Sequence, residues 1–417
     1  MTNTTHDPST DLLPGGWTID RLDAVVEVLD SRRKPVNAKE RAERPGTIPY
    51  FGATGQVGTI DEALFDEPLV LLGEDGVQFF DPNKSKAYEI DGPTWVNNHA
   101  HVLRPDEGKI PRTLLVHYLN QFDYRGSANG TTRLKLTQKA MNAIPVVLPP
   151  PVEQEQIVEI LEAHLSRLDA ALQHIQTLRD KAAQFRRSLL HAAFTGALTG
   201  HDPSTSELPD GWEPCALGDL LTLKSGFAYK SRDWQDHGIP VVKIANVRNG
   251  QVSLTECSFV SCAIADETAQ FGVISGDLLM TLTGEIGAIG IYREEEPARL
   301  NQRVARLDLR DGGEIAFEFL VLLLQSPTVR GPLWDLAHGM AQPNISPKRV
   351  AELPLSLPPR PEQERIVEIL EAHLSRLDAA LAAADVVEER ASALRRSLLH
   401  AAFTGKLTEK WREQAHV

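Results

Sequence analysis

The sequence predicts an α+β fold in which two mixed α/β domains alternate with two long helices. The helices are expected to pack as an antiparallel coiled coil, in a pseudo-twofold cyclic arrangement. Residues 157–172 read IVEILEAHLSRLDAAL, and residues 366–381 read the same. Residues 186–196 read RRSLLHAAFTG, as do residues 395–405. Both pairs are offset by 209 residues. Copies at one fixed offset indicate copies of one structural unit.

A second repeat has an offset of 195 residues. The pentapeptide HDPST occurs at residues 6–10 and 201–205, and the motif LPxGW occurs at 13–17 and 208–212. The segment after the first helix therefore resembles the start of the chain. The repeat is cyclic, and it predicts that the N-terminal strand lies near the end of the second helix.

Each repeated helix has readable ends and an apolar stripe. Prolines precede each copy, which suits a helix start, and Gly196 and Gly405 follow, which suits a helix end. Apolar residues between those ends recur with the alternating spacing of four and three that buries a stripe against a partner helix. The predicted seam is Leu161, Leu165, Leu168 and Leu172 in the first copy, and Leu370, Leu374, Leu377 and Leu381 in the second.

The most direct partner for each stripe is the other copy. About 40 residues at ~1.5 Å per residue make a rod of roughly 60 Å. An antiparallel pair would place the two attached domains at opposite ends of that rod. The alternative is that each helix packs only on its own globular domain.

The segments between the helices predict the two mixed domains. Short β-type runs broken by turn residues occur at 68–72, 239–244 and 288–292, and helical stretches at 113–122 and 317–324. The end of each domain corresponds at the offset of 209, whereas the middles differ. The predicted division is a first domain at 1–150, a helix at 151–199, a second domain at 200–358 and a helix at 359–417.

Composition indicates a cytoplasmic protein. No apolar run is long enough to cross a bilayer, the N-terminus has no signal-peptide pattern, and three cysteines without a CxxC pair favour reduced thiols. The formal net charge of −14 argues against nucleic acid. Two local clusters of basic residues, at 32–44 and 299–310, argue the other way.

Motifs of catalysis are missing from the sequence. We find no phosphate-binding GxxxxGK[ST] loop, no GxSxG nucleophile elbow and no amino-methyltransferase motif. FGATGQVG at 51–58 has glycine spacing but no following helix signal, so tight turns are favoured. His99 and His101 would share one face of a strand, but without an evident third ligand surface or packing roles are favoured. We expect no catalytic residue, no metal and no cofactor bound by this chain.

The combined pattern resembles the specificity subunit of Type I restriction-modification systems. The alternation of two variable domains with two repeated helices covers nearly the whole chain. The resemblance also rests on IPYFGATG at 48–55, GEDG at 73–76, WVNNHAHVL at 95–103, QPNIS at 342–346 and the proline-rich start of each helix.

The resemblance implies a subunit without a catalytic centre, in which each variable domain is a target-recognition domain that reads half of an asymmetric bipartite duplex site. The helices would set the spacing and dock two methyltransferase subunits, which carry S-adenosylmethionine. Restriction subunits would add ATP- and Mg-dependent cleavage.

Candidate DNA contacts are side chains suited to bidentate or phosphate contact. In the first domain they are Tyr50, Thr54, Gln56, Lys84, Asn97, Asn98 and Arg133. In the second they are Lys224, Tyr229, Lys230, Lys243, Asn246, Arg248, Arg303, Gln342 and Asn344. For any one of them, a structural or solvated role is the competing interpretation; Asn97 and Asn98 could shape a turn, and Tyr50 could be core. For the whole protein, the competing interpretation is a coiled-coil scaffold with two protein-binding heads and no DNA role, which the acidity favours.

Overall fold

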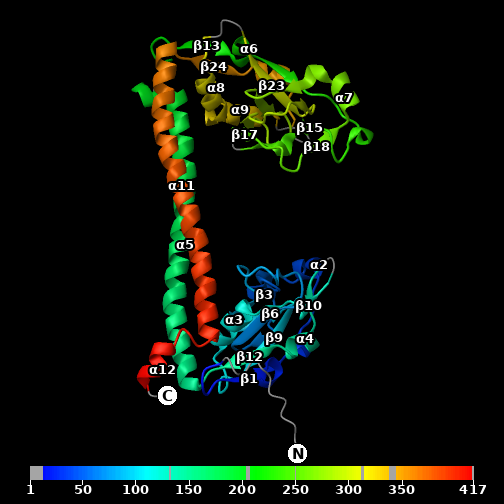
Figure 1. Ribbon diagram of the computed structural model, residues 1–417, viewed down its shortest axis with the longest axis vertical. Coiled ribbons are helices and arrows are strands. Elements are labelled where there is room, and N and C mark those ends of the chain that lie inside the picture. Colours follow the sequence, from blue (N-terminus) through cyan, green and yellow to red (C-terminus); the bar gives the residue numbers. More distant parts are fainter. Residues whose placement is uncertain are drawn as a thin grey trace, which may run out of the picture. The chain divides into compact units, whose positions relative to one another are not determined.

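A computed structural model of the chain (Figure 1) describes residues 13–130, 133–202, 207–248, 250–310, 314–337 and 344–415. The chain divides into two compact units. The first unit is Met1–Gln176 with Ala384–Val417, and the second is Thr177–Ala383. Each unit therefore contains one mixed domain and half of each long helix.

The two long helices match residue for residue. Helix α5 spans Pro151–Phe194 and helix α11 spans Arg360–Phe403, each with 44 residues and each starting and ending at positions 209 apart. Gly196 and Gly405 follow with φ of 79° and 75°. This left-handed conformation ends a helix at little cost only for glycine, so the helix ends predicted from Gly196 and Gly405 are confirmed. The predicted division at 151–199 and 359–417 ran further, because residues 195–199 and 404–417 lie beyond the ends of α5 and α11.

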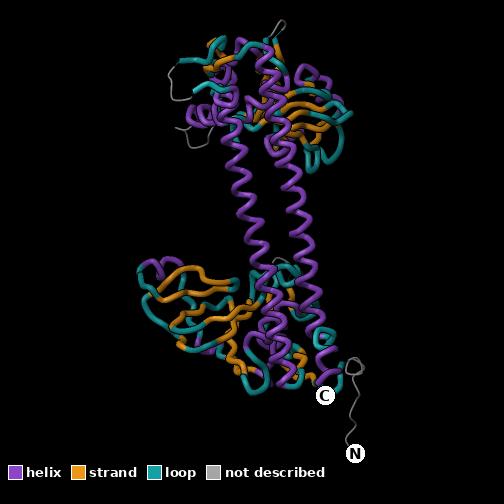
Figure 2. Tube along the Cα trace, turned by 90° about the vertical axis from the view of Figure 1, so that its left-hand side faces the viewer, coloured by secondary structure: helices purple, strands orange, loops and turns teal. Residues whose placement is uncertain are grey.

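Within each unit the two helices run antiparallel and side by side (Figures 1 and 2). In the first unit Arg395 of α11 forms an ion pair with Asp169 of α5. In the second unit Arg186 of α5 forms the equivalent pair with Asp378 of α11. Exposed pairs of this kind contribute little to stability, but they define the helix register.

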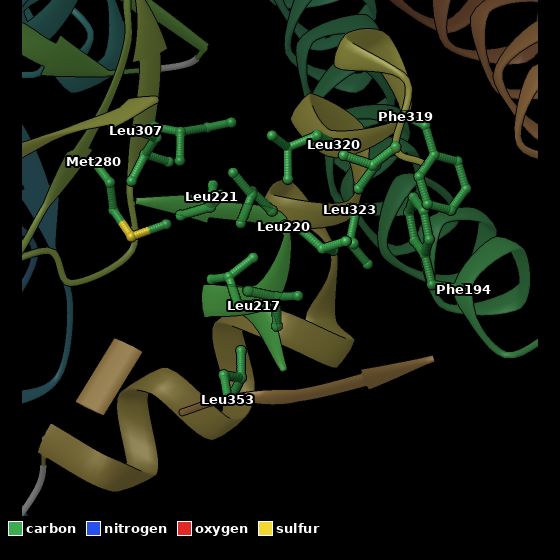
Figure 3. Packing of buried hydrophobic residues seen from close by; sticks show 14 of the residues in the cluster. Phe194, Leu217, Leu220, Leu221, Met280, Leu307, Phe319, Leu320, Leu323 and Leu353 are labelled. Atoms are coloured by element: carbon green, nitrogen blue, oxygen red, sulfur yellow. The ribbon is translucent and has the colours of Figure 1, made fainter. Parts of the chain in front are cut away.

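The ends of the helices pack on their domains as well as on one another. In the first unit Leu161 and Leu165 share one buried cluster with Phe403 and with Leu115 of the domain. In the second unit the equivalent Leu370 and Leu374 share a cluster that also contains the residues shown in Figure 3. Helix-helix and helix-domain packing, posed as alternatives from the sequence, therefore occur together. The remaining seam residues are half-buried: Leu168, Leu172, Leu377 and Leu381.

The first domain carries two four-stranded sheets, in the orders β2-β9-β6-β7 and β4-β3-β8-β5. Its strands are β1 (Thr18–Arg21), β2 (Val26–Val28), β3 (Ile48–Gly52), β4 (Gly55–Ile60), β5 (Phe65–Asp66), β6 (Leu69–Gly73), β7 (Ala87–Ile90), β8 (Pro93–Val96), β9 (Ala100–Pro105), β10 (Ala128–Asn129), β11 (Lys135–Leu136) and β12 (Pro145–Leu148). Its helices are α1 (Leu22–Val25), α2 (Ala38–Ala42), α3 (Arg112–Gln121) and α4 (Gln138–Asn142).

The second domain has a six-stranded sheet, β14-β23-β20-β21-β17-β16, and a four-stranded sheet, β18-β15-β22-β19. Its strands are β13 (Glu213–Ala216), β14 (Leu221–Ser225), β15 (Ile239–Val242), β16 (Val247–Arg248), β17 (Gly250–Val252), β18 (Ser258–Val260), β19 (Gly272–Val273), β20 (Leu278–Thr281), β21 (Ile289–Ile291), β22 (Ala298–Leu300), β23 (Val304–Leu309) and β24 (Pro354–Leu357). Its helices are α6 (Leu217–Leu220), α7 (Cys262–Glu267), α8 (Phe317–Gln325), α9 (Pro327–Ala337) and α10 (Pro347–Ala351); α12 (Glu409–Ala415) follows α11 in the first unit.

Both domains share one frame of sheets. The order β2-β9-β6-β7 matches β14-β23-β20-β21, and β4-β3-β8-β5 matches β18-β15-β22-β19. The central pairs β3–β8 and β15–β22 are both parallel, whereas most other pairs are antiparallel. The first and last strands of each domain pair with each other in an antiparallel two-stranded sheet, which we call the foot. It is β1–β12 in the first domain and β13–β24 in the second. The hairpin β16–β17 is an addition in the second domain.

The N-terminal segment lies at the end of the second helix, as the cyclic repeat predicts. A Cβ built on Gly405 would lie 2.2 Å from Cγ of Pro14, and one built on Gly196 would lie 2.6 Å from Cγ of Pro209. Proline therefore packs on the helix-ending glycine in both units. The contact joins neighbouring segments of the chain in the second unit and the two chain ends in the first.

Candidate nucleic-acid interface

The same asparagine shapes a turn after the central parallel strand in both domains. In the first domain the N–H of Asn97 donates to the carbonyl of Phe51 (3.0 Å), and Oδ1 of Asn97 accepts from the N–H of His99 (2.8 Å). In the second domain Asn301 makes both contacts, with Val242 at 3.0 Å and Arg303 at 3.2 Å. The turn geometry is thus held fixed while the residues it presents differ.

Those presented residues are Asn98 and His99 in the first domain and Gln302 and Arg303 in the second. Asn98, Gln302 and Arg303 are exposed, and His99 is partly exposed. Amide and guanidinium groups on a rigid turn are suited to bidentate contact with base edges. Asn301 and Gln302 were not predicted from the sequence. The signal that would have identified them is an Asn followed by Asn or Gln directly after a buried strand, shared by 97–98 and 301–302.

A second pair of equivalent positions borders each turn. Asp75, two residues beyond β6, forms an isolated bridge with Lys135, and Thr283, two residues beyond β20, forms one with Asn344. In the first domain, Asp75 contacts both His99 (2.8 Å) and Arg133 (2.6 Å).

In the second domain, Thr283 Oγ1 donates to Asn344 Oδ1 at 2.9 Å. The contacts beside the turn are thus ionic in the first domain and neutral in the second. The surfaces around the two turns therefore differ in charge as well as in side-chain type.

Next to Asp75 lies an ionic cluster made of Asp30, Arg33, Glu74, His101 and Lys135. Its first four side chains are mostly or fully buried, whereas Lys135 covers it from the surface. Nδ1 of His101 lies 2.5 Å from Asp30 and Nε2 lies 2.9 Å from the carbonyl of Leu136. Arg33 contacts Asp30 (3.1 Å) and Glu74 (2.7 Å), and Lys135 contacts Glu74 (2.8 Å). Burial would raise the pKa of Glu74, but hydrogen bonds from Lys135 and Arg33 outweigh burial and lower it.

The ionic cluster also contains a metal-type donor set. Ligand atoms of Asp30, Glu74 and His101 lie within 4.8 Å of one another. Arg33 and Lys135 already neutralise both carboxylates, so a divalent cation would have to displace them. The donor chemistry therefore fits an ion-pair network better than a metal site.

Most predicted contact residues lie at the surface. In the first domain Thr54, Gln56, Lys84, Asn98 and Arg133 are exposed, and in the second Lys224, Lys230, Arg248, Arg303 and Asn344 are exposed. Tyr229 and Lys243 are half-buried. Gln342 lies outside the described residues. Their contact with bases stays a prediction.

Three predicted contact residues are buried in structural roles. Tyr50 is 1% exposed and its hydroxyl donates to the carbonyl of Val36 (3.1 Å). Asn97 holds the turn described above. Asn246 accepts from the N–H of Lys243 and donates to the carbonyl of Ser253, both at 2.9 Å. The side chains of Tyr50 and Asn246 are already hydrogen-bonded inside their domains, which argues against base contacts for these two. Asn97 is 9% exposed and is tied to its turn through Oδ1, so a base contact by its amide nitrogen stays a prediction.

The two predicted basic clusters are partly neutralised. In the first, Arg32 pairs with Glu67, Arg33 with Glu74, and Arg44 with Asp61 and Glu62. In the second, Arg306 pairs with Asp308, which also binds Lys224. Arg303 forms no ion pair with a described residue, and the same holds for Lys34, Lys39 and Arg41 in the first cluster and for Arg299 and Arg310 in the second. Linear clustering thus overestimated the free positive charge.

These features define a class of proteins with two related domains and two repeated helices. Each domain packs on parts of both long helices and contains a turn held by an asparagine. The family model described as "Type I restriction modification DNA specificity domain" matches residues 14–178 and 209–383. The chain belongs to this family, as a specificity subunit of the Type I restriction-modification kind.

Relatives support the assignment over most of their length. The chain is 24% identical over 376 residues to the Type I restriction enzyme EcoBI specificity subunit of Escherichia coli, covering 86% of this chain and 79% of that one. It is 25% identical over 420 residues to the Type I restriction enzyme MjaVIII specificity subunit of Methanocaldococcus jannaschii, covering 95% and 94%.

One solved structure is similar in fold. It comes from work on complex assembly and conformational transition of the type I R-M system, and it matches with a TM-score of 0.63 at 18% identity, covering 94% of this chain and 98% of that one. In the part of the chain that the structure describes, every helix is too short or too polar to span a bilayer.

Proposed function

We propose that this chain is a non-catalytic subunit that reads a bipartite, asymmetric duplex sequence. One observation carries the proposal: the two domains hold the same turn with the same asparagine, Asn97 or Asn301, yet present different side chains from it. A constant support with variable residues is what recognition of two unlike half-sites requires. Asn98 and His99 would serve one half-site, and Gln302 and Arg303 the other.

The helices support the proposal that two identical partners dock on this chain. Leu178 and Phe185 on α5 are 58% and 48% exposed, and Val387 and Leu394, at the same positions on α11, are 48% and 50% exposed. Large apolar side chains on a charged helix surface indicate a protein interface. Because the two pairs are equivalent, they would bind two copies of one methyltransferase subunit.

The reaction would belong to those partners. Methyl transfer needs S-adenosylmethionine, which we assign to the methyltransferase subunits, and ATP with Mg would be used by restriction subunits where they are present. We propose no cofactor for this chain. Its own part is to select the site and fix the register in which the partners meet the DNA.

Mapping of methylated bases tests the recognition role. The chain is co-expressed with its methyltransferase partner, and methylated adenines are sequenced genome-wide. Arg303→Gln is expected to relax the half-site read by the second domain by about 1–3 kcal/mol at one base pair, leaving the other half-site unchanged. Lys410→Gln, an exposed cation on α12, is the matched control.

Two outcomes decide against this role. Methylation that is site-specific and unchanged at every position would remove Arg303 from the contacts. A complex that shows no salt-dependent binding to duplex DNA would support a scaffold with two protein-binding heads instead.

Changing the length of the helices tests separately whether they set the spacing between the two half-sites. Inserting four residues in α5 and four in α11, at equivalent positions near their middles, is expected to change the number of unread bases between half-sites. Both half-sites should stay the same. New base preferences after such an insertion would contradict the role of the helices as spacers.

A further inference from the structure

The second domain contains a pocket that combines aromatic rings, free cations and side-chain amides. It has a volume of about 390 Å³ and is lined chiefly by Tyr229, Trp234, Lys243, Asn301, Gln302 and Arg303. This volume lies within the ~300–1,000 Å³ that small-molecule sites occupy. Two of the lining residues, Gln302 and Arg303, are those that the turn presents for the proposed base recognition.

Aromatic packing makes one wall of the pocket rigid. The rings of Tyr229 and Trp234 lie 5.4 Å apart, and the hydroxyl of Tyr229 lies 3.2 Å from Oγ1 of Thr268. Nζ of Lys243 sits 4.2 Å from the centre of the Trp234 ring and also contacts Oγ of Ser258. Of the three donors of the ammonium group, at least one remains for a ligand.

The pocket carries uncompensated positive charge in an acidic chain. Among the described residues that line it there is no carboxylate, and neither Lys243 nor Arg303 forms an ion pair with a described residue. Arg306 and Arg330 of the same domain, by contrast, are paired with Asp308 and Glu285. Two unpaired cations beside aromatic rings attract a ligand that is both anionic and planar.

The first domain lacks these groups at the matching positions. Its turn places Gly52 where the second domain has Lys243, and His99, bound to Asp75, where the second domain has Arg303. The combination is therefore a property of the second domain and not of the shared frame.

We propose that this pocket holds one nucleotide of the DNA whose base has left the helical stack. The inference rests on the proposed function. Aromatic rings supply a stacking surface for any base, the amides of Asn301 and Gln302 lie within reach of a base edge, and the two cations face the flanking phosphates. Recognition in the second half-site thus includes local opening of the duplex, whereas recognition in the first does not depend on such a pocket.

Base-analogue fluorescence tests the inference with the full complex of this chain and its methyltransferase partner. The mapped target carries 2-aminopurine or pyrrolocytosine at each position of the second half-site in turn. The adenine that becomes methylated is left out, since the partner itself would unstack it. With the wild-type chain, one position is expected to brighten on binding.

Variants then connect that signal to the pocket. Trp234→Leu is expected to abolish the brightening and to weaken binding about 10-fold, whereas Trp234→Phe retains both. Arg303→Gln, an exposed change that leaves the fold intact, is expected to reduce the signal and the salt dependence of binding. Phe80→Leu, an exposed aromatic residue of the first domain, is the control and should change neither.

Absence of any brightening, or brightening that survives both Trp234→Leu and Arg303→Gln, would overturn the pocket while specific methylation still upholds the proposed function. Loss of site-specific methylation by the wild-type complex would overturn both.

Discussion

The two domains place different kinds of side chain at the same position in their sheets. Where strands β6 and β9 meet in the first domain, Glu74 and His101 belong to a buried ionic cluster. At the equivalent positions of β20 and β23 in the second domain stand Leu282 and Ala305, both buried and apolar. The sheets have the same order in both cases.

The sheet order does not depend on whether charged or apolar side chains fill this position. Charged side chains in one domain and apolar side chains in the other are compatible with the same strand pairing. The shared sheet order is therefore specified by the strand pairing itself, by the terminal strand pairs β1–β12 and β13–β24, and by the packing of the helix ends on each domain. A buried ion network adds little net stability over apolar packing, but it becomes costly when one member is removed.

The largest effect on stability is expected where the starts of α5 and α11 pack on their domains. The two units should behave alike there. Leu161→Ala and Leu370→Ala remove fully buried side chains at equivalent positions. Each is expected to lower the free energy of unfolding of its own unit by about 2–5 kcal/mol. Hydrogen exchange assigned to each unit measures both. A large effect in one unit alone would mean that the two helix starts are not equivalent.

The ionic cluster should be sensitive to the loss of one charge. Asp30→Asn leaves Arg33 and His101 without their shared carboxylate. We expect a loss of about 3 kcal/mol, confined to the first domain, as for breaking a buried ion pair. Asp66→Asn, an exposed acid of the same domain, is the control. Equal exchange rates in the two variants would contradict the assigned importance of the cluster.

A matched pair of tryptophans isolates one hydrogen bond. Nε1 of Trp17 donates to Glu153 at 2.8 Å, whereas Nε1 of the equivalent Trp212 is buried without a partner among the described residues. Changing each to Phe costs similar packing, so Trp17→Phe should destabilise more, by about 2 kcal/mol. Thermal unfolding compares the two. Equal losses would show that the bond to Glu153 contributes nothing measurable.

Acid should remove the contribution of Glu74 to the stability of the first domain. Hydrogen bonds lower the pKa of Glu74, so its folded pKa lies below its unfolded one. Its contribution is therefore present above the unfolded pKa and is lost as pH falls through the folded pKa. Glu74→Gln should cost about 1 kcal/mol at pH 7, and the cost should shrink as pH falls through the folded pKa of Glu74. Urea unfolding over a series of pH values checks this, and a cost that does not shrink in acid would contradict it.

The smallest effect on stability is expected at the exposed apolar pairs. Phe185→Ser and Leu394→Ser should change the free energy of unfolding by less than about 0.5 kcal/mol, since both side chains are half exposed. Each should nevertheless remove one methyltransferase copy from the complex, as measured by native mass spectrometry. Two bound copies in the double variant would contradict the docking assignment.

Much of the fold could be predicted because local pattern and repeat agree. The stripes of leucines and the flanking proline and glycine located α5 and α11, and the stretches at 113–122 and 317–324 correspond to α3 and α8. The offset of 195 residues predicted that the N-terminal strand lies near the end of the second helix, where Pro14 packs on Gly405. Each inference needed only spacing along the chain.

The candidate interface was less accessible because it depends on contacts between distant residues. The sequence does not show that Asp61 neutralises Arg44, or that the carbonyl of Val36 takes the hydroxyl of Tyr50. Nor does it show that Asn301 copies Asn97, since the two lie 204 residues apart and match neither repeat offset. Only the strand pairing brings these relations to light.

The two-stranded feet give the molecule a modular route to new specificity. Each domain begins and ends on adjacent antiparallel strands. The rest of the domain is therefore one continuous segment whose two ends lie close together next to the helices. Genetic exchange across that foot could replace a whole reading head in one event. The helix starts and the docking residues would pass unaltered into the recombinant.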